Sequence, residues 1–156
     1  MPSLHQIYLS LEEERRRVLQ RFKDVNEEHF YYVAKNNTWT PEQLFRHILN
    51  AFVVISRMLP GETLQRHKFA LTSSEIPNNR MPLEEVSHAL EDISAIISQR
   101  LKDLTPEMEE EVILAWDKKI SRYKAILWLI GHEYAHLGQI SWLLNRSIEK
   151  RSKDPE

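Results

Sequence analysis

The sequence predicts an all-α fold in a single domain, from its scarcity of glycine, its apolar spacing and its length. Only three glycines occur in 156 residues, too few for a chain with many tight β-turns. In four long stretches, apolar residues recur at steps of three and four, the spacing of amphipathic helices. A chain of this length builds one sizeable core. We therefore expect one domain over residues 1–148 and a charged, frayed tail over residues 149–156.

The four predicted helices form a four-helix bundle in which a long crossover joins the second helix to the third. Thr40 is suited to cap the second helix, with Pro41 at its first position and Gln43 completing a capping box. The predicted helices span, in order, residues 3–25, 41–59, 82–104 and 121–146.

Two connections separate these helices. The crossover covers residues 62–81 and begins with a short helix at residues 62–70. A short irregular connector, residues 107–119, precedes the last helix, and residues 112–116 within it are expected to be extended. The last helix is apolar on two faces, so we expect it to be the most buried of the four.

The composition is that of a globular protein, with 42% apolar and 28% charged residues. The longest nearly uncharged run, residues 125–140, falls short of the roughly 20 apolar residues that a bilayer requires. Residues 1–14 lack the apolar block of a signal peptide. We therefore expect no membrane association and a cytoplasmic location.

Charge and cysteine content limit the possible chemistry. The formal net charge of −2 offers no general attraction to phosphate backbones, so no nucleic-acid partner is expected. The absence of cysteine rules out a disulfide framework, a thiolate nucleophile and a cysteine-based zinc site. Any metal ion must therefore be held by nitrogen and oxygen ligands.

Two histidines, His132 and His136, stand four residues apart in the last predicted helix. This spacing brings both imidazoles to one face of the helix, where they can share a metal ion or form a hydrogen-bonded core pair. With Glu133 they also spell His-Glu-x-x-His, the zinc-protease motif in which the glutamate is the general base. A protease further needs a third ligand, usually downstream, and no histidine follows His136. We therefore disfavour a protease.

A third histidine, His47, lies on the apolar side of the second predicted helix and points into the bundle. Three neutral imidazoles with positions left for water describe a catalytic type of site for zinc or a similar metal. His88, beside the apolar stripe of the third helix, is the reserve ligand. Glu133 has three possible roles: a base, an acceptor that orients a ligand histidine, or one partner of an ordinary salt bridge.

Two motifs, WTPEQLFRHI at residues 39–48 and HEYAHLGQI at residues 132–140, resemble the DinB-like superfamily of small metal-binding four-helix bundles. The DNA polymerase that shares this name is unrelated. In the superfamily, histidines at the positions of His47, His132 and His136 bind a divalent metal. Leu137 stands where many members have arginine, a difference that leaves the three metal ligands intact.

The resemblance implies a metal more firmly than it implies a reaction. It does not distinguish zinc, nickel, iron or manganese. Members include thiol-dependent S-transferases, a thiol-dependent isomerase and proteins classed as metal-dependent hydrolases. The chain is therefore expected to act on a small molecule, with Glu133 as a candidate catalytic group and a low-molecular-weight thiol as a possible cofactor. The alternative is a non-catalytic metal-binding or stress-associated module. Homodimers are frequent in the superfamily.

Overall fold

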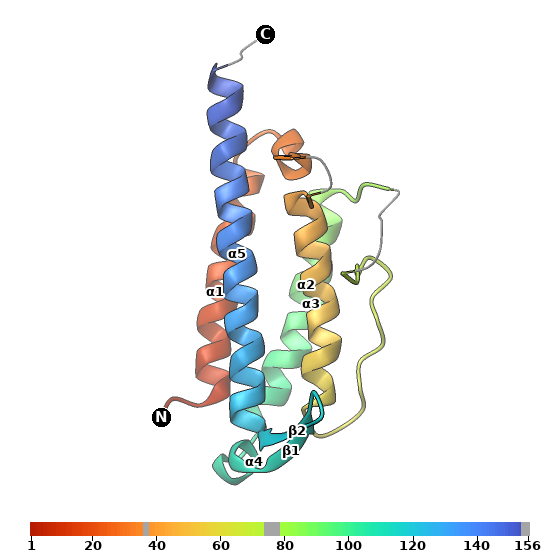
Figure 1. The fold of residues 1–156 in the computed structure, drawn as a ribbon, viewed down its shortest axis with the longest axis vertical. Coiled ribbons are helices and arrows are strands. Elements are labelled where there is room, and N and C mark those ends of the chain that lie inside the picture. Colours follow the sequence, from red (N-terminus) through yellow and green to blue (C-terminus); the bar gives the residue numbers. More distant parts are fainter. Residues whose placement is uncertain (36–37, 74–78, 154–156) are drawn as a thin grey trace.

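The chain is mostly helical, as its apolar spacing predicts. The computed structural model describes residues 1–35, 38–73 and 79–153. Four long helices lie side by side along the long axis of the molecule (Figure 1), and α1 and α2 each pack against both α3 and α5. These helices are α1 (Leu4–Lys23), α2 (Pro41–Arg57), α3 (Leu83–Lys102) and α5 (Arg122–Lys153).

Side-chain caps define where the first two long helices begin. Ser3 and Gln6 form a capping box at the start of α1, and the predicted box of Thr40 and Gln43 is present at the start of α2. Each box satisfies backbone N–H groups that the first helical turn leaves without partners. Between these helices the chain forms a short 3₁₀ helix, η1 (Glu27–Tyr31).

The connection from α2 to α3 runs back along the outside of the helices, so α2 and α3 point in the same direction (Figure 1). The short helix expected at residues 62–70 is absent; the segment instead lies against α2, where Arg46 Nε donates to Phe69 O. Leu64 N donates to Ser56 Oγ, and Leu71 N donates to Arg46 O. Residues 74–78 of the predicted crossover lie outside the described residues.

The expected connector before the last helix is ordered rather than irregular. It contains the short helix α4 (Pro106–Glu110) and an antiparallel hairpin of β1 (Val112–Ala115) and β2 (Lys118–Ser121). The extended stretch predicted near residues 112–116 is confirmed, whereas its partner strand was not predicted. The hairpin and α4 lie at the end of the molecule where α5 begins (Figure 1).

Buried polar contacts fasten this end of the molecule. Arg122, at the start of α5, donates from Nε to the carbonyl oxygen of Met58 at 2.7 Å, just beyond the end of α2. Glu109 of α4 accepts a hydrogen bond from Leu4 N at 3.2 Å, satisfying one N–H of the first turn of α1. The hairpin that follows α4 is thereby held beside the first turns of α5.

The last helix is longer and more exposed than the sequence suggests. It continues through Lys153, whose ammonium group pairs with Glu149 at 3.0 Å, so residues 149–153 of the predicted tail belong to the helix. Residues 154–156 of the predicted tail lie outside the described residues. The expectation that this helix is the most buried was wrong, because the long helices in contact with it are α1 and α2 and its Trp128 and Trp142 side chains are 58% and 54% exposed.

One apolar core connects all four long helices. Its largest fully buried side chains include Tyr8, Phe22, Phe30, Phe45 and Phe52. Within the ranges that the structure describes, none of the helices combines the length and apolar character needed to cross a membrane.

Candidate metal site

His47 is fixed by the segment that returns from α2 toward α3. Its Nδ1 lies 2.8 Å from the carbonyl oxygen of Leu71. A carbonyl oxygen only accepts, so Nδ1 carries the proton and the neutral ring has its lone pair on Nε2. Arg46 holds this segment in place, since its backbone oxygen accepts from Leu71 N and its Nε donates to Phe69 O at 2.8 Å. Metal-ligating histidines are commonly oriented by such a backbone contact.

The helical spacing brings His132 and His136 together as expected. Their Nε2 atoms are 3.1 Å apart, which is also the distance of the hydrogen-bonded pair that the sequence left open. Two nitrogens bound to one zinc ion at about 2.0–2.1 Å and the tetrahedral angle lie roughly 3.3 Å apart. The pair therefore has nearly the separation that two ligands of one ion require.

The third histidine lies beside this pair. The ring centroids of His47 and His136 are 5.4 Å apart, and the rings meet edge to face. Within the described ranges, however, no three His, Cys, Asp or Glu side chains are already arranged to hold a metal ion. The site thus consists of a close pair from α5 and one neighbouring imidazole from α2.

The environment favours the neutral imidazole of His136. Burial lowers the pKa of His136 below its ordinary value, and the neighbouring His132 and His47 lower it further, while a side-chain hydrogen bond with Gln139 opposes them. Neutral histidine is the form that binds metals. His132 is exposed and His136 and His47 are half-buried, so the site is open to solvent. An all-imidazole donor set of this kind suits zinc, nickel or iron.

Tryptophans flank the three histidines on both sides. The Trp39 ring meets His47 with centroids 5.1 Å apart. On the other side, Trp128 stacks on His132 at 5.3 Å with an interplanar angle of 13°. Trp128 precedes His132 by one helical turn, so their contact follows from helical spacing, whereas the contact of Trp39 with His47 depends on how the segment before α2 folds.

Glu133 points away from the histidines into the interior. Both of its oxygens accept hydrogen bonds from Arg15, at 2.7 Å from Nε and 3.0 Å from Nη2. Burial by itself would lower the Arg15 pKa, but Glu133 raises it overall. The interhelical salt bridge that the sequence left open is therefore present, and a catalytic role for Glu133 stays a prediction without a contact to support it.

The salt bridge belongs to a larger buried network. Arg15 Nη1 also donates to Ser94 Oγ at 2.8 Å, Ser94 Oγ donates to Glu12 at 2.6 Å, and Tyr8 OH lies 2.8 Å from Ser94 Oγ. Burial raises the pKa of Tyr8 to about 12. This network joins α1, α3 and α5 within the core, so it serves the fold of the helices that carry the site.

The reserve ligand does not reach the site. His88 is exposed on α3, where its Nε2 lies 3.9 Å from a Glu84 oxygen. It lines a different cavity, of about 330 Å³, together with residues of α1 and of the segment that follows it. The structure thus brings together His47, His132 and His136 but not His88.

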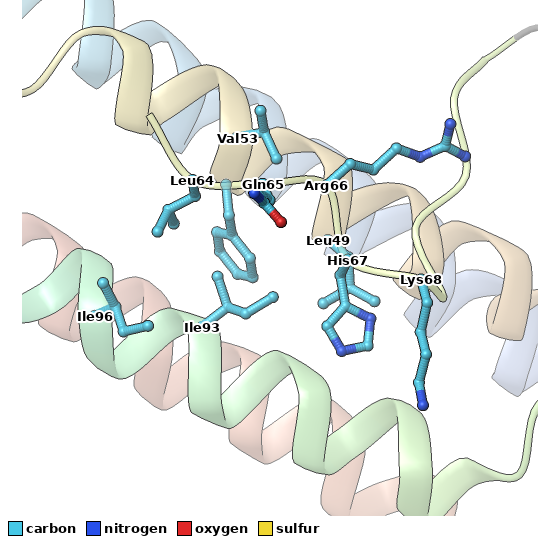
Figure 2. A pocket seen from close by; sticks show the side chains of 10 residues that line it. Leu49, Val53, Leu64, Gln65, Arg66, His67, Lys68, Ile93 and Ile96 are labelled. Carbon is cyan, nitrogen blue, oxygen red and sulfur yellow. The ribbon is translucent and has the colours of Figure 1, made fainter. Parts of the chain in front are cut away.

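A larger cavity, of about 420 Å³, lies between α2, α3 and the returning segment. Figure 2 shows Leu49, Val53, Leu64, Ile93 and Ile96 around it, with the charged ends of Arg66 and Lys68 directed away from this apolar cluster. None of the three site histidines lines this cavity. Its lining is mostly apolar, and His67 is the one side chain in it of a type that commonly binds metals.

Solved structures of similar fold support the architecture. A DinB-like protein from Bacillus cereus ATCC 10987 superposes with a TM-score of 0.69 at 15% identity, covering 93% of each chain. A DinB-like protein of Bacillus subtilis, YjoA, has a TM-score of 0.65 at 18% identity, covering 91% of each chain. At these identities the likeness concerns the fold. No curated protein is detectably similar to the chain in sequence.

The sequence also matches a family model. The model describes the DinB superfamily and matches residues 10–140, a range that contains all three site histidines and all four long helices except their outermost parts. The chain therefore belongs to the DinB superfamily.

Proposed function

We propose that the chain binds one divalent metal ion through His47, His132 and His136, and that it acts on a small molecule as a metal-dependent enzyme. The observation that carries the proposal is the 3.1 Å distance between the Nε2 atoms of His132 and His136 on α5. The His47 ring lies beside this pair, and its Nδ1 donates to Leu71 O. We further propose that the four long helices form a complete four-helix bundle around this site.

The donor set determines what such an ion would contribute. A divalent ion held by three imidazoles acts as a Lewis acid and lowers the pKa of a coordinated water or thiol. The chain's own residues prepare the site: Leu71 O holds the tautomer that leaves Nε2 of His47 free, and the exposed position of His132 leaves an approach for a substrate.

The reaction is either hydrolysis or transfer to a thiol. The chain has no cysteine, so a thiol would have to come from a low-molecular-weight cofactor. Such cofactors are kept reduced in the cytoplasm, where we place the protein. Metal-loaded protein should be assayed with a panel of thiols and electrophilic acceptors, and in parallel with activated esters and amides. Turnover that requires a thiol assigns a transferase, and turnover without one assigns a hydrolase.

Ligation itself is tested by metal content. Protein purified without added metal should contain about one ion per chain, and His132→Ala and His136→Ala should each reduce this strongly. His88→Ala is the matched control, because His88 is an exposed helical histidine outside the site. Equal metal content in the parent chain and all three variants would contradict the proposal.

A non-catalytic role is the alternative, and one observation favours it: the histidines come from two helices, so an ion would link α2 to α5. An ion that binds only the folded chain raises its stability by mass action. Cobalt-substituted protein distinguishes the two roles. Exchangeable water on cobalt supports the enzyme, whereas a closed coordination sphere together with a large rise in Tm supports the structural module.

We also propose that the chain forms a homodimer through the exposed side of α5. Leu127, Tyr134 and Trp142 are 39%, 37% and 54% exposed there. A Cβ built on Gly131 or Gly138 would meet nothing within 4 Å, so a second helix has room to approach closely. Light scattering should give twice the chain mass, and Leu127→Glu combined with Trp142→Glu should give a monomer. A monomeric parent chain would contradict this proposal.

A further inference from the structure

We propose that Trp116 and Trp128, called here the aromatic platform, bind a planar aromatic group of the substrate that carries an anionic substituent. The inference rests on the proposed function for the role of the adjoining histidines. It specifies the class of substrate: small aromatic acids or their derivatives.

The platform is continuous with the histidine site. Trp116 meets Trp128 with ring centroids 5.1 Å apart at 65°, and Trp128 stacks on His132 at 13°. His132 in turn meets His136 with ring centroids 4.6 Å apart. A substrate ring resting on the platform would therefore hold its substituent close to the imidazole pair.

Both tryptophans are left open by the described parts of the chain. Trp116 is 48% and Trp128 is 58% exposed, although tryptophan is among the side chains that gain most from burial. Trp142 on the same helix is similarly exposed, but its ring contact is with Arg146. Exposed aromatic area next to a polar site is typical of a ligand-binding surface.

The backbone of the hairpin turn adds an independent argument. Trp116 and Asp117 connect β1 to β2 with φ values of 51° and 62°. A two-residue hairpin turn of this kind favours Asn-Gly, and the left-handed conformation is sterically unfavourable for residues with bulky side chains. The turn by itself therefore disfavours tryptophan at position 116. A binding role for the indole ring would explain why tryptophan is present there.

Nearby charges favour an anionic ligand. Lys118 and Lys119 follow the turn on β2 and Lys124 precedes Trp128 by one helical turn; all three are exposed. Asp117 is the acidic residue of the turn itself. Indole faces attract cations, but the three lysines outnumber Asp117 in the segments that carry the platform, and this charge balance opposes a cationic ring. Aromatic stacking contributes about 0.5–1.5 kcal/mol beyond area burial, which predicts a preference of up to about tenfold for a planar ring.

The test is an NMR titration of the metal-free, isotope-labelled full chain with sodium 2-naphthoate. It follows the four indole N–H signals, and each signal is assigned by a single Trp→Phe change. The signals of Trp116 and Trp128 should shift and that of Trp142 should not. Decahydro-2-naphthoate, which has the same carbon skeleton but is not planar, and the cation 2-naphthylmethylammonium should each bind several-fold more weakly. Equal affinity for all three, or shifts at Trp142 alone, would overturn the proposal.

Trp116→Asn separates binding from structure, because asparagine suits the left-handed turn. This variant should be at least as stable as the parent chain and yet bind 2-naphthoate several-fold more weakly; lower stability with unchanged binding would assign Trp116 a structural role. If the platform signals shift on dilution without ligand, the second copy of the chain covers the platform itself rather than the neighbouring face of α5, and the proposal is contradicted. Because the titration uses metal-free protein, it can succeed or fail independently of metal ligation.

Comparing benzohydroxamate with acetohydroxamate on zinc-loaded protein then links the platform to the metal. Trp128→Ala should abolish the preference for the aryl compound and leave acetohydroxamate affinity unchanged, whereas Trp142→Ala should change neither. If Trp128→Ala still prefers the aryl compound, the platform does not bind the aryl group of a metal-bound ligand, and the proposed link is contradicted.

Discussion

Removing the carboxylate of Glu133 should destabilise the fold rather than disable the metal site. In Glu133→Ala, Arg15 keeps its position in the core, 3% exposed, but loses the acceptor of two of its hydrogen bonds. Removing one partner of a buried pair costs about 3–5 kcal/mol. This loss is a large fraction of the roughly 5–15 kcal/mol that holds a domain folded. Urea denaturation of the metal-free protein measures it.

Two further variants make this prediction sharper. Arg15→Met combined with Glu133→Leu removes both charges and should recover most of the lost stability, because replacing a buried pair with apolar groups is often neutral or favourable. Glu14→Ala, which breaks the exposed pair with Arg17, should have a much smaller effect than Glu133→Ala. A Glu133→Gln protein that keeps its stability but loses catalytic turnover would refute the structural assignment and restore Glu133 as a candidate base.

Three other changes test individual parts of the fold. Thr40→Ala removes the hydroxyl that accepts from Gln43 N and should lower the free energy of unfolding by about 1 kcal/mol in urea denaturation. Asp117→Gly relieves the positive φ of the hairpin turn and should raise stability by about 0.5–1 kcal/mol; a decrease would contradict the strain argument. Burial lowers the pKa of His29 in the folded chain, and the nearby charge of Arg151 lowers it further. The unfolded chain therefore binds a proton at His29 more tightly than the folded chain does. The resulting stability is present above the ordinary histidine pKa of about 6.5 and is lost as pH falls through the lower folded value. Between pH 7.5 and 5, His29→Gln should therefore lose less stability than the parent chain.

The helices and the histidine pair were predictable because their signals are local. The capping box of Thr40 and Gln43 spans four residues, and the 3.1 Å contact of His132 with His136 follows from one helical turn. The apolar position of His47 on its own helix was enough to select it as the third ligand. That it lies beside His136 is now observed, while ligation stays a prediction.

What the sequence did not reveal depends on contacts between distant segments or on unusual local conformations. The bond from His47 to Leu71 O forms only when the returning segment folds onto α2. Glu133 meets Arg15 across 118 positions of sequence, so the sequence could suggest a salt bridge for Glu133 but could not name its partner. The β2 strand has no alternating apolar pattern and its turn lacks glycine, the usual hairpin signal. The exposure of Trp128 could not be inferred, since an apolar helix face does not show which neighbour covers it.

The central claim is that His47 completes the metal site, and competition titration with a chelator tests it most directly. The dissociation constant for zinc should be measured for the parent chain, His47→Ala and His88→Ala, each first shown to be folded. Loss of a metal ligand should exceed the roughly 10–100-fold effect typical of residues that only orient ligands, so His47→Ala should weaken binding by more than about 100-fold, and His88→Ala should leave it unchanged. Equal zinc affinity in His47→Ala and the parent chain would contradict the account.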